Sequence, residues 1–382
     1  MTIQFSKTEE FKKAKAALGD AMATGDETKT GEALNSYLDV LQTEVTKAVT
    51  ENVNNEMLDR SILQNRGTNV LTSEETQFFN RVVSDGGFTD DAILPITTQE
   101  RVFEDLVREH PLIQAIGVQD LGPVTRFITA DPTKAYAWGP LFGDIAGQVN
   151  AAFSEEDMGT FKLTSFAAIP NDMVELGPVW LERYVRTLLV ESYATGLEFG
   201  FVNGGGSTVN QPIGLNKNVT AETGAITPKT ANGVLTFEPS EKGTIVSGEL
   251  HGVVSALSTN EKGDSRPIAN RVNMVVNPQD AISVQMRNTI QTANGQWVTA
   301  LPYNIRLVES EVVDPGQALF FVRGEYLAAV AGGYRFKRFD QTLALEDATL
   351  YTIKQFANGK PKDNKAALLY DLDIDFAPTP VV

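Results

Sequence analysis

Residues 177–215 read GPVWLERYVRTLLVESYATGLEFGFVNGGGSTVNQPIGL, a long helical pattern that ends in three glycines. Pro178 directly follows Gly177, and proline is favoured at the first position of a helix. Four of the residues that follow share one helical face: Leu181, Tyr184, Val185 and Leu188. At about 1.5 Å per residue, a helix over residues 180–202 is about 35 Å long.

A run of three glycines closes this helix: Gly204, Gly205 and Gly206. A phosphate-binding Walker loop requires a lysine followed by serine or threonine after its last glycine, whereas this run continues with Ser-Thr-Val. A dinucleotide-binding loop follows a strand and opens a helix, and this run does the opposite. We therefore predict a flexible turn at the helix exit, where glycine is favoured on backbone grounds alone.

The composition is that of a soluble globular protein with a strong acidic excess. The 382 residues carry a net charge of −17, and 42% of them are hydrophobic and 21% charged. Nucleic-acid phosphates repel such a chain unless its positive charge is concentrated locally. The absence of cysteine excludes disulfides and thiolate metal sites. No apolar run approaches the length of a membrane span, so we expect a protein made in a cytoplasm, with no membrane contact.

The first ninety residues are predicted to be helical and nearly free of strands. A capping-box pair, Thr72 and Glu75, opens one helix. Further upstream, apolar residues recur at a spacing of three and four: Leu34, Leu38, Leu41, Val45 and Ala48. This spacing suits a short coiled coil, and a single helix packed on its own neighbours shows the same pattern. A glycine-rich linker follows at residues 86–95, and we expect it to be exposed.

Residues 126–169 are predicted to form a long two-stranded excursion. Its arms lie at residues 126–138 and 160–169, and the segment between them is rich in glycine. Loops of this length are uncommon in compact domains and are usually functional or disordered. The apolar residues of this loop indicate either a subunit interface or packing of the hairpin on itself. They are Tyr136, Trp138, Leu141 and Phe142.

Beyond Gly214 the pattern alternates between helices and strands, which predicts a mixed α+β fold. Helices are expected at residues 251–257 and 278–290, and strands at 273–277, 304–309 and 317–323. Near the end of the chain, two apolar runs flank the tripeptide Asn-Gly-Lys at residues 358–360. This arrangement indicates a β-hairpin with its turn at those residues.

No group of residues forms a convincing catalytic or metal-binding motif. The two histidines, His110 and His251, lack carboxylate partners at a recognisable spacing. The aspartates at 371, 373 and 375 lack the glycine and the closing glutamate of a calcium loop. The run YRFKRF at 334–339 fits a strand with aromatic side chains inward and cations outward better than it fits a nucleic-acid site. We therefore predict no enzyme activity, no cofactor and no metal.

Three segments, taken in order, resemble the major capsid proteins of tailed bacteriophages with the Hong Kong 97-type fold. The first is FKLTSFAAIPNDMVELGPVWLERYVRTLLVESYATGLEFGFVNGGG with the Gln-Pro-x-Gly sequence at 211–214. The second is MVVNPQDAISVQMRN, with Asn277 and Pro278 at the turn, and the third is VVDPGQALFFVRGEYLAAVAGGYRF. No single motif is stringent, but their order is specific, and the resemblance covers nearly the whole chain.

The resemblance implies a division of the chain into five parts. They are a helical scaffolding segment with its linker (1–90), an N-terminal arm (91–125), an extended β-hairpin loop (126–168), a peripheral domain with a long spine helix (169–212 and 335–370) and an axial α/β domain (213–334 and 371–382). Under this division, the three glycines at 204–206 form a hinge between the last two domains, which lets subunits differ in bend.

The resemblance also implies a function. Copies of the chain are expected to form hexamers and pentamers of an icosahedral head shell that encloses double-stranded DNA without sequence-specific binding. A portal protein and a maturation protease are implied partners, and the linker is where such a protease would cut. Assembly is expected in the cytoplasm of a bacterial host, and the product belongs to the virion. Some family members cross-link subunits through a loop lysine and an asparagine. Lys134 lies in the loop and Asn358 in the predicted hairpin turn, so these two residues are the candidate pair, but the sequence places no catalytic glutamate for the reaction.

Two other functions stay open on sequence alone. The shell protein of a cellular nanocompartment that packages a cargo shares this fold, although it usually lacks a long helical preface. An enzyme of unknown chemistry requires a pocket lined with titratable groups of shifted pKa.

Overall fold

The computed structural model describes residues 9–24, 27–64, 70–89, 92–120, 126–130, 153–157, 161–174, 176–220, 223–238, 243–292, 294–339 and 347–374. The chain divides into two compact units, Met1–Asn80 and Arg81–Val382. The helix α3 (Ser73–Ser84) spans the point of division. The expected mixed α+β class is confirmed by the helices and sheets of the second unit.

The first unit is helical, as predicted. Helix α1 (Glu9–Thr24) packs on α2 (Glu27–Gln64), where the rings of Phe11 and Tyr37 lie 5.5 Å apart. At the start of α3 the predicted capping box is present, because Thr72 N donates to Glu75 Oε2 (2.9 Å) and Glu75 N donates to Thr72 Oγ1 (3.3 Å).

Helix α2 leaves much of its apolar side uncovered within the chain. Its 38 residues correspond to about 57 Å of helix. Six large apolar side chains on it are at least 44% exposed: Leu34, Leu38, Val49, Val53, Met57 and Leu58. Within the described residues of the first unit, α1 therefore leaves the predicted stripe largely exposed at Leu34 and Leu38.

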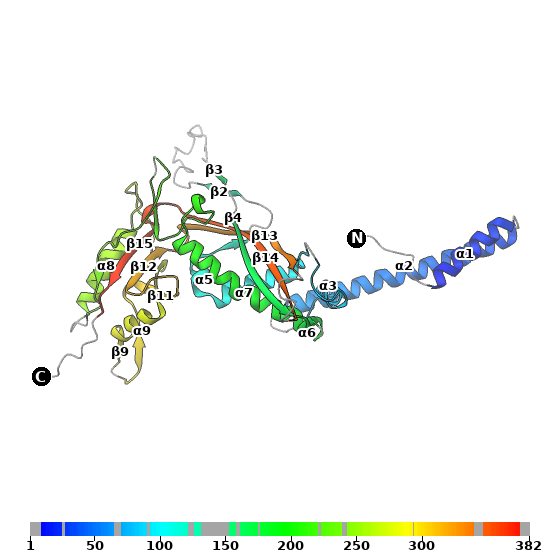
Figure 1. Ribbon diagram of the computed structural model, residues 1–382, viewed down its shortest axis with the longest axis horizontal. Helices are drawn as coiled ribbons and strands as arrows, with labels where there is room; N and C mark the ends of the chain where they lie inside the picture. The colour runs from blue at the N-terminus through cyan, green and yellow to red at the C-terminus, as the bar shows by residue number, and fades with distance from the viewer. Residues whose placement is uncertain are drawn as a thin grey trace, which may run out of the picture. The chain divides into compact units, whose positions relative to one another are not determined.

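The second unit contains a four-stranded sheet in the order β1-β13-β14-β4. Its strands are β1 (Gln119–Asp120), β4 (Phe161–Pro170), β13 (Tyr326–Phe339) and β14 (Ala348–Pro361). Only β1 runs parallel to its neighbour, and the other pairs are antiparallel. Helix α7 (Pro178–Asn203) runs beside this sheet (Figure 1) and contacts β4 and β14.

The buried face of α7 follows a spacing of four residues: Leu181, Val185, Leu189, Tyr193, Leu197 and Phe201. The predicted face is therefore correct at Leu181 and Val185, whereas Tyr184 and Leu188 are only half-buried. Pro178 occupies the predicted first helical position. Two further helices, α4 (Ile96–Glu109) and α5 (Pro111–Ile116), pack against α7.

The second unit also contains a five-stranded mixed sheet in the order β11-β8-β12-β15-β7. Its strands are β7 (Val234–Leu235), β8 (Val272–Val276), β11 (Arg306–Glu309), β12 (Gln317–Val322) and β15 (Ala367–Leu372). Helices α8 (Thr244–Leu257) and α9 (Pro278–Arg287) contribute to the core of this part (Figure 1). The predicted strands at 273–277, 304–309 and 317–323 and the predicted helix at 251–257 are confirmed in place, although β11 begins only at Arg306. The helix predicted at 278–290 is present but ends at Arg287, and Thr289 and Ile290 belong to β9.

The hydrophobic core of the five-stranded part follows the two-residue period of its strands. Met274 of β8 and Phe320 of β12 pack with Leu250 of α8 on one face, and all three are fully buried. Leu319 and Leu369 point to the opposite face and lie beside the end of α7. The sheet is therefore buried on both faces, which explains why β8 and β12 read as nearly continuous apolar runs.

The described residues of the second unit also form three two-stranded ribbons. They are β2 (Arg126–Ala130) with β3 (Phe153–Asp157), β5 (Lys217–Val219) with β6 (Ile226–Pro228), and β9 (Thr289–Gln291) with β10 (Trp297–Thr299). The short helices are α6 (Asn171–Val174), η2 (Ser207–Val209), η3 (Pro302–Asn304) and η4 (Asn364–Ala366).

Three sequence expectations are wrong. Residues 161–170 do not form the second arm of the two-stranded excursion. They form β4, which pairs with β14 in the four-stranded sheet, whereas β2 pairs with residues 153–157. Residues 358–360 are not a turn, because β14 continues through them and β15 belongs to the other sheet.

The third error concerns the linker at residues 86–95, which is not exposed along its length. Phe88 is 1% exposed and stacks on Phe336, with ring centroids 4.5 Å apart. Its N–H donates to the hydroxyl of Tyr351 (3.2 Å). Leu94 is buried as well. The segment around Phe88 is thus anchored on the four-stranded sheet.

Candidate functional site

The residues predicted to act in subunit contact lie outside the described residues. These are Lys134, Tyr136, Trp138, Leu141 and Phe142, and their roles stay predictions. The structure places the base of their loop, where β2 pairs antiparallel with β3 from Arg126 opposite Asp157 to Ala130 opposite Phe153. The two-stranded character of the excursion is confirmed at this base.

Asn358, the predicted cross-link asparagine, lies within β14 opposite Ala329 of β13. Its side-chain Oδ1 accepts a hydrogen bond from the N–H of Gly359 (2.7 Å). Asn358 therefore lies inside a paired strand and not in the hairpin turn that the sequence predicted. The pairing of Asn358 with Lys134 stays a prediction.

The three-glycine run forms a closely packed crossing of two chain segments. Gly204 N donates to Gly200 O (3.1 Å), Gly206 N donates to Pro212 O (3.1 Å), and Gly214 N donates to Gly204 O (2.9 Å). A Cβ atom on Gly204 would lie 2.3 Å from the carbonyl oxygens of both Gly200 and Pro212. Glycine is therefore required here because two backbones touch, a reason that the sequence pattern did not reveal.

The segment after the crossing is bonded to α7 and to both long strands. Leu215 N donates to Phe201 O (2.8 Å) on α7. Ile213 N donates to Gly359 O on β14 (2.8 Å), and Ile213 O accepts from the hydroxyl of Tyr326 on β13 (2.9 Å). The passage from α7 into the five-stranded part is thus held by backbone hydrogen bonds and by one from the Tyr326 hydroxyl, and its hinge role stays a prediction.

Charged side chains join α4 to α7 in a buried network. Arg186 of α7 pairs with Asp105 of α4 and donates from Nε to Glu182 Oε1 (3.1 Å). Arg101 Nη1 lies 3.5 Å from the same Glu182 oxygen. Because Glu182 is 2% exposed, its charge depends on these two arginines.

A second polar cluster lies where α7 meets the five-stranded part. Ser310 Oγ, just after β11, donates to Glu198 Oε2 of α7 (2.6 Å). His110 Nδ1, between α4 and α5, lies 3.5 Å from Glu198 Oε1. Burial raises the pKa of Glu198, and the hydrogen bond from Ser310 and the proximity of His110 oppose that rise. Glu198 and Ser310 were not predicted as part of a cluster. The sequence signal at this position was His110, one of the two histidines of the chain.

Elsewhere, Lys229 directly follows β6 and connects the β5–β6 ribbon to η4. Its Nζ donates to Asn218 Oδ1 (2.7 Å) and to Asn364 O (2.6 Å). Burial lowers the pKa of Lys229 to about 8, against the opposing effect of Glu261 and Asp363.

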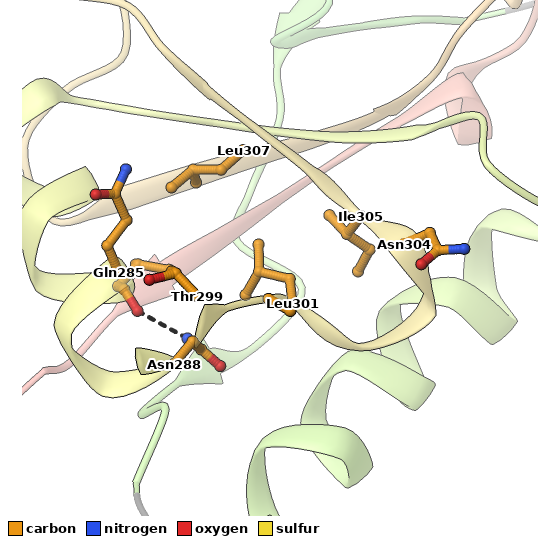
Figure 2. A pocket seen from close by; sticks show the side chains of 9 residues that line it. Gln285, Asn288, Thr299, Leu301, Asn304, Ile305 and Leu307 are labelled. Carbon is orange, nitrogen blue, oxygen red and sulfur yellow. Dashed lines mark hydrogen bonds between the residues drawn. The ribbon is translucent and has the colours of Figure 1, made fainter. Parts of the chain in front are cut away.

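A pocket of about 500 Å³ opens between α9 and the segment leading to β11 (Figure 2). Leu301, Ile305 and Leu307 form its apolar part, and Gln285, Asn288, Thr299 and Asn304 supply amide and hydroxyl groups. Asn288 Nδ2 donates to Val284 O (2.8 Å). No titratable side chain lines this pocket, so it offers no acid or base for catalysis.

Other motifs have structural roles. In the YRFKRF run, Tyr334 and Phe336 of β13 are buried and Arg335 and Lys337 are exposed, as predicted. The prediction is wrong at the end of the run, where Phe339 is exposed and Arg338 is half-buried. Across the described residues, no cluster of three or more potential metal ligands occurs. Among the described helices, none combines the length and apolarity needed to cross a bilayer.

Asn277 and Pro278, the predicted turn, begin α9. Asn277 is the N-cap and its side chain accepts from Gln279 N (3.2 Å), while Pro278 occupies the first turn.

The model of the phage capsid family matches residues 91–372, nearly three quarters of the chain. The chain belongs to the phage capsid family. The predicted function as a capsid shell protein is confirmed, and this family assignment describes a structural protein.

Several solved structures are similar to this phage capsid protein at low identity. The capsid of an empty GTA particle matches at 14% identity and a TM-score of 0.43, over 68% of this chain and 89% of that one. The procapsid of satellite phage P4 with its size determination protein matches at 9% and 0.44, over 72% and 99%. The holo-SrpI encapsulin complex from Synechococcus elongatus matches at 8% and 0.35, over 76% and 94%. No curated protein matches the chain.

Proposed function

We propose that copies of this capsid protein assemble into hexamers and pentamers that close into an icosahedral phage head around double-stranded DNA. The family match over residues 91–372 carries the proposal. The acidic excess supports it, because the net charge is −17 for the whole chain and −12 for residues 87–382, and a shell of that sign encloses DNA without adhering to it. Assembly takes place in the cytoplasm of the bacterial host, with a portal protein at one vertex, and the shell becomes part of the virion.

The two sheets suggest a division of the shell domain. The peripheral domain comprises α7 and the four-stranded sheet, and the axial domain comprises the five-stranded sheet with α8 and α9. Since β13 is continuous from Tyr326 to Phe339, the whole strand belongs to the peripheral side. Since β15 pairs with β12, residues 367–372 belong to the axial side. These assignments shift the boundaries that the sequence indicated near residues 335 and 371.

Residues 1–90 act as a scaffolding segment in this proposal. They precede the matched family region, and α2 presents exposed apolar residues that a second copy can cover. A long helical preface of this kind also favours a phage head over a nanocompartment shell. A maturation protease would cut before Gly87, because Phe88 is anchored on the four-stranded sheet and Asp85 and Gly86 are exposed.

Electron microscopy of negatively stained samples tests the proposal. The full chain is compared with a chain lacking residues 1–86 and with a control that lacks only residues 1–8. We expect closed shells from the full chain and the control, and aggregates or free capsomers from the longer deletion, whose folding is checked by circular dichroism. Full-length protein that stays monomeric at high concentration would contradict the shell proposal. Normal shells from the longer deletion would contradict the scaffolding role alone.

A further inference from the structure

Two buried polar atoms between α7 and the four-stranded sheet have no hydrogen-bond partner among the described residues. They are the hydroxyl oxygen of Tyr193 on α7 and the Oε1 of Gln355 on β14. Tyr193 is 0% exposed and Gln355 is 4% exposed. Buried polar groups are nearly always hydrogen-bonded, because an unbonded one has given up its hydrogen bonds to water and gained nothing in return. These two atoms therefore require a partner from outside the protein.

The two side chains meet at a third, that of Tyr334 on β13. The rings of Tyr193 and Tyr334 lie 5.2 Å apart at an interplanar angle of 71°. Burial raises the pKa of Tyr334, and a hydrogen bond from the side chain of Gln355 opposes this rise. Tyr334 thus contacts both residues that carry an unbonded atom. We name these three residues, Tyr193, Tyr334 and Gln355, the Tyr–Gln cluster.

Strand β13 has an irregularity at the Tyr–Gln cluster. Its pairing with β14 shifts register between Ala331 and Arg335, so residues 332–334 share a single position of β14, that of Gln355. Such a bulge interrupts the ladder and leaves the extra residues unpaired. Two of the three residues in the bulge are glycines, which have no side chain to fill the space beside Gln355.

Helix α7 encloses the Tyr–Gln cluster from the other side, because its backbone comes close to the sheet here (Figure 1). Leu163 of β4 lies opposite Gln355, and a Cβ on Gly196 would lie 3.0 Å from Leu163 Cδ1. Gly196 follows Tyr193 by three residues, so the two share one side of the helix. The cluster is therefore covered by the helix and closed to bulk solvent.

The chemistry of the Tyr–Gln cluster selects a small, uncharged ligand. Burial raises the pKa of Tyr193, and the neighbouring Tyr334 adds to this rise, so the hydroxyl stays protonated. A buried water needs two to four polar partners, and the two hydroxyls and the amide provide them. Exchanging the oxygen and nitrogen of the Gln355 amide does not change the requirement, because one atom bonds to Tyr334 and the other is left without a partner.

We infer that an internal water molecule binds in the Tyr–Gln cluster and joins α7 to the bulge of β13. The hydroxyl of Tyr193 donates to the water, and the water donates to Oε1 of Gln355. Hydrogen bonds through this water hold α7 on the sheet in addition to the apolar contacts of its buried face. The inference is independent of shell assembly, because all three residues belong to one folded chain.

Tyr193→Phe in the full chain tests the inference, because it removes only the hydroxyl. Loss of a water-mediated bond should raise the unfolding equilibrium constant about fivefold or more, measured by urea unfolding of unassembled subunits. A hydroxyl without any partner predicts the opposite, since its removal relieves an unmet hydrogen bond. Tyr184→Phe, at a half-buried position of the same helix, is the matched control and should unfold like the wild type. A Tyr193→Phe chain as stable as the wild type, or more stable, would overturn the inference.

Direct observation of the water needs no variant. A crystal structure or electron-microscopy map of the wild type, at a resolution that shows ordered water, is inspected between α7 and the bulge. We expect density within hydrogen-bond distance of the Tyr193 hydroxyl and of Gln355 Oε1. No density at this place, in a map that shows other buried waters, would overturn the inference even if Tyr193→Phe fails to fold.

Discussion

At the scale of single residues, neighbouring glycines of one run have different structural demands. A Cβ on Gly204 would meet two backbone carbonyl oxygens at 2.3 Å, and neither backbone can move without breaking the crossing. A Cβ on Gly205 would meet the end of the Val209 side chain at 2.8 Å, and Val209 is 55% exposed and free to turn away. The run is therefore fixed by close contact at one position and tolerant at the next.

We predict that Gly204→Ala destabilises the protein by more than about 3 kcal/mol, because overpacking against backbone has no inexpensive relief. Gly205→Ala should cost about 1 kcal/mol, since only a side chain must rotate. Chemical denaturation of both variants measures the difference. Similar costs at the two positions would show that the crossing is looser than its hydrogen bonds indicate, and would favour the hinge interpretation.

Glu198 is a second residue whose environment sets a measurable property. Burial raises its pKa, so the native state holds a proton that the unfolded state has released between the ordinary value, near 4.5, and the raised value. The contribution of this group to stability is therefore complete below the unfolded pKa and is lost as pH rises through the folded pKa.

We predict that Glu198→Gln removes this pH dependence. The amide oxygen still accepts from Ser310 but cannot ionise, so the stability of the variant relative to the wild type should increase as pH rises through that window. Thermal unfolding across a pH series measures the difference between the two proteins. Ser310→Ala serves as a control that removes the hydrogen bond and leaves the carboxyl group. A difference that stays flat with pH would contradict the shifted pKa.

At the scale of elements, the joint between α4 and α7 depends on charges that the core encloses. Arg186 bridges Asp105 and Glu182, and both acids are buried. Arg108 also reaches Asp105, at 2.6 Å, but its own side chain is 66% exposed. Both arginines therefore contact Asp105, but Arg108 is exposed to water and Arg186 is not. Truncating each arginine to alanine should therefore lower the free energy of unfolding by different amounts.

We predict that Arg186→Ala destabilises the protein by about 3–5 kcal/mol, because it leaves buried carboxylates with less compensation. Arg108→Ala should cost less than about 1 kcal/mol, as exposed ion pairs do. Urea unfolding of the two variants distinguishes these values. Equal effects would mean that water reaches the network in solution.

The sequence predicted elements well where local pattern and burial agree. Helix α7 was placed within two residues at its start, because Gly-Pro opens it and glycine ends it. Strand β14 was misread, because Asn-Gly-Lys at 358–360 is a strong local turn signal and its pairing with β13 and β4 depends on residues far away in the chain. The anchoring of Phe88 was missed for the same reason, since its partner Phe336 lies 248 residues further on.

Burial and exposure of individual side chains were likewise predictable only in part. Tyr334 and Phe336 could be assigned inward from their alternation alone, because strand period fixes the face of a side chain. The exposed side of α9 could not be recognised, because Ile282 and Met286 look like ordinary core positions of an amphipathic helix until the structure places them outward. Exposure is a tertiary property, and sequence periodicity gives only the side of the helix.

At the scale of the whole molecule, assembly must overcome the repulsion of copies that each carry a net charge of −17. The Debye length falls from about 10 Å at 0.1 M salt to about 3 Å at 1 M, so salt shortens this repulsion while apolar contacts persist. If apolar contacts dominate between subunits, added sodium chloride increases the assembled fraction at fixed protein concentration. Light scattering follows assembly, and thermal unfolding in the same buffers separates any effect on folding. Shells held mainly by exposed ion pairs would respond in the opposite direction, so a decrease in the assembled fraction with salt would place the dominant contacts among charged residues instead.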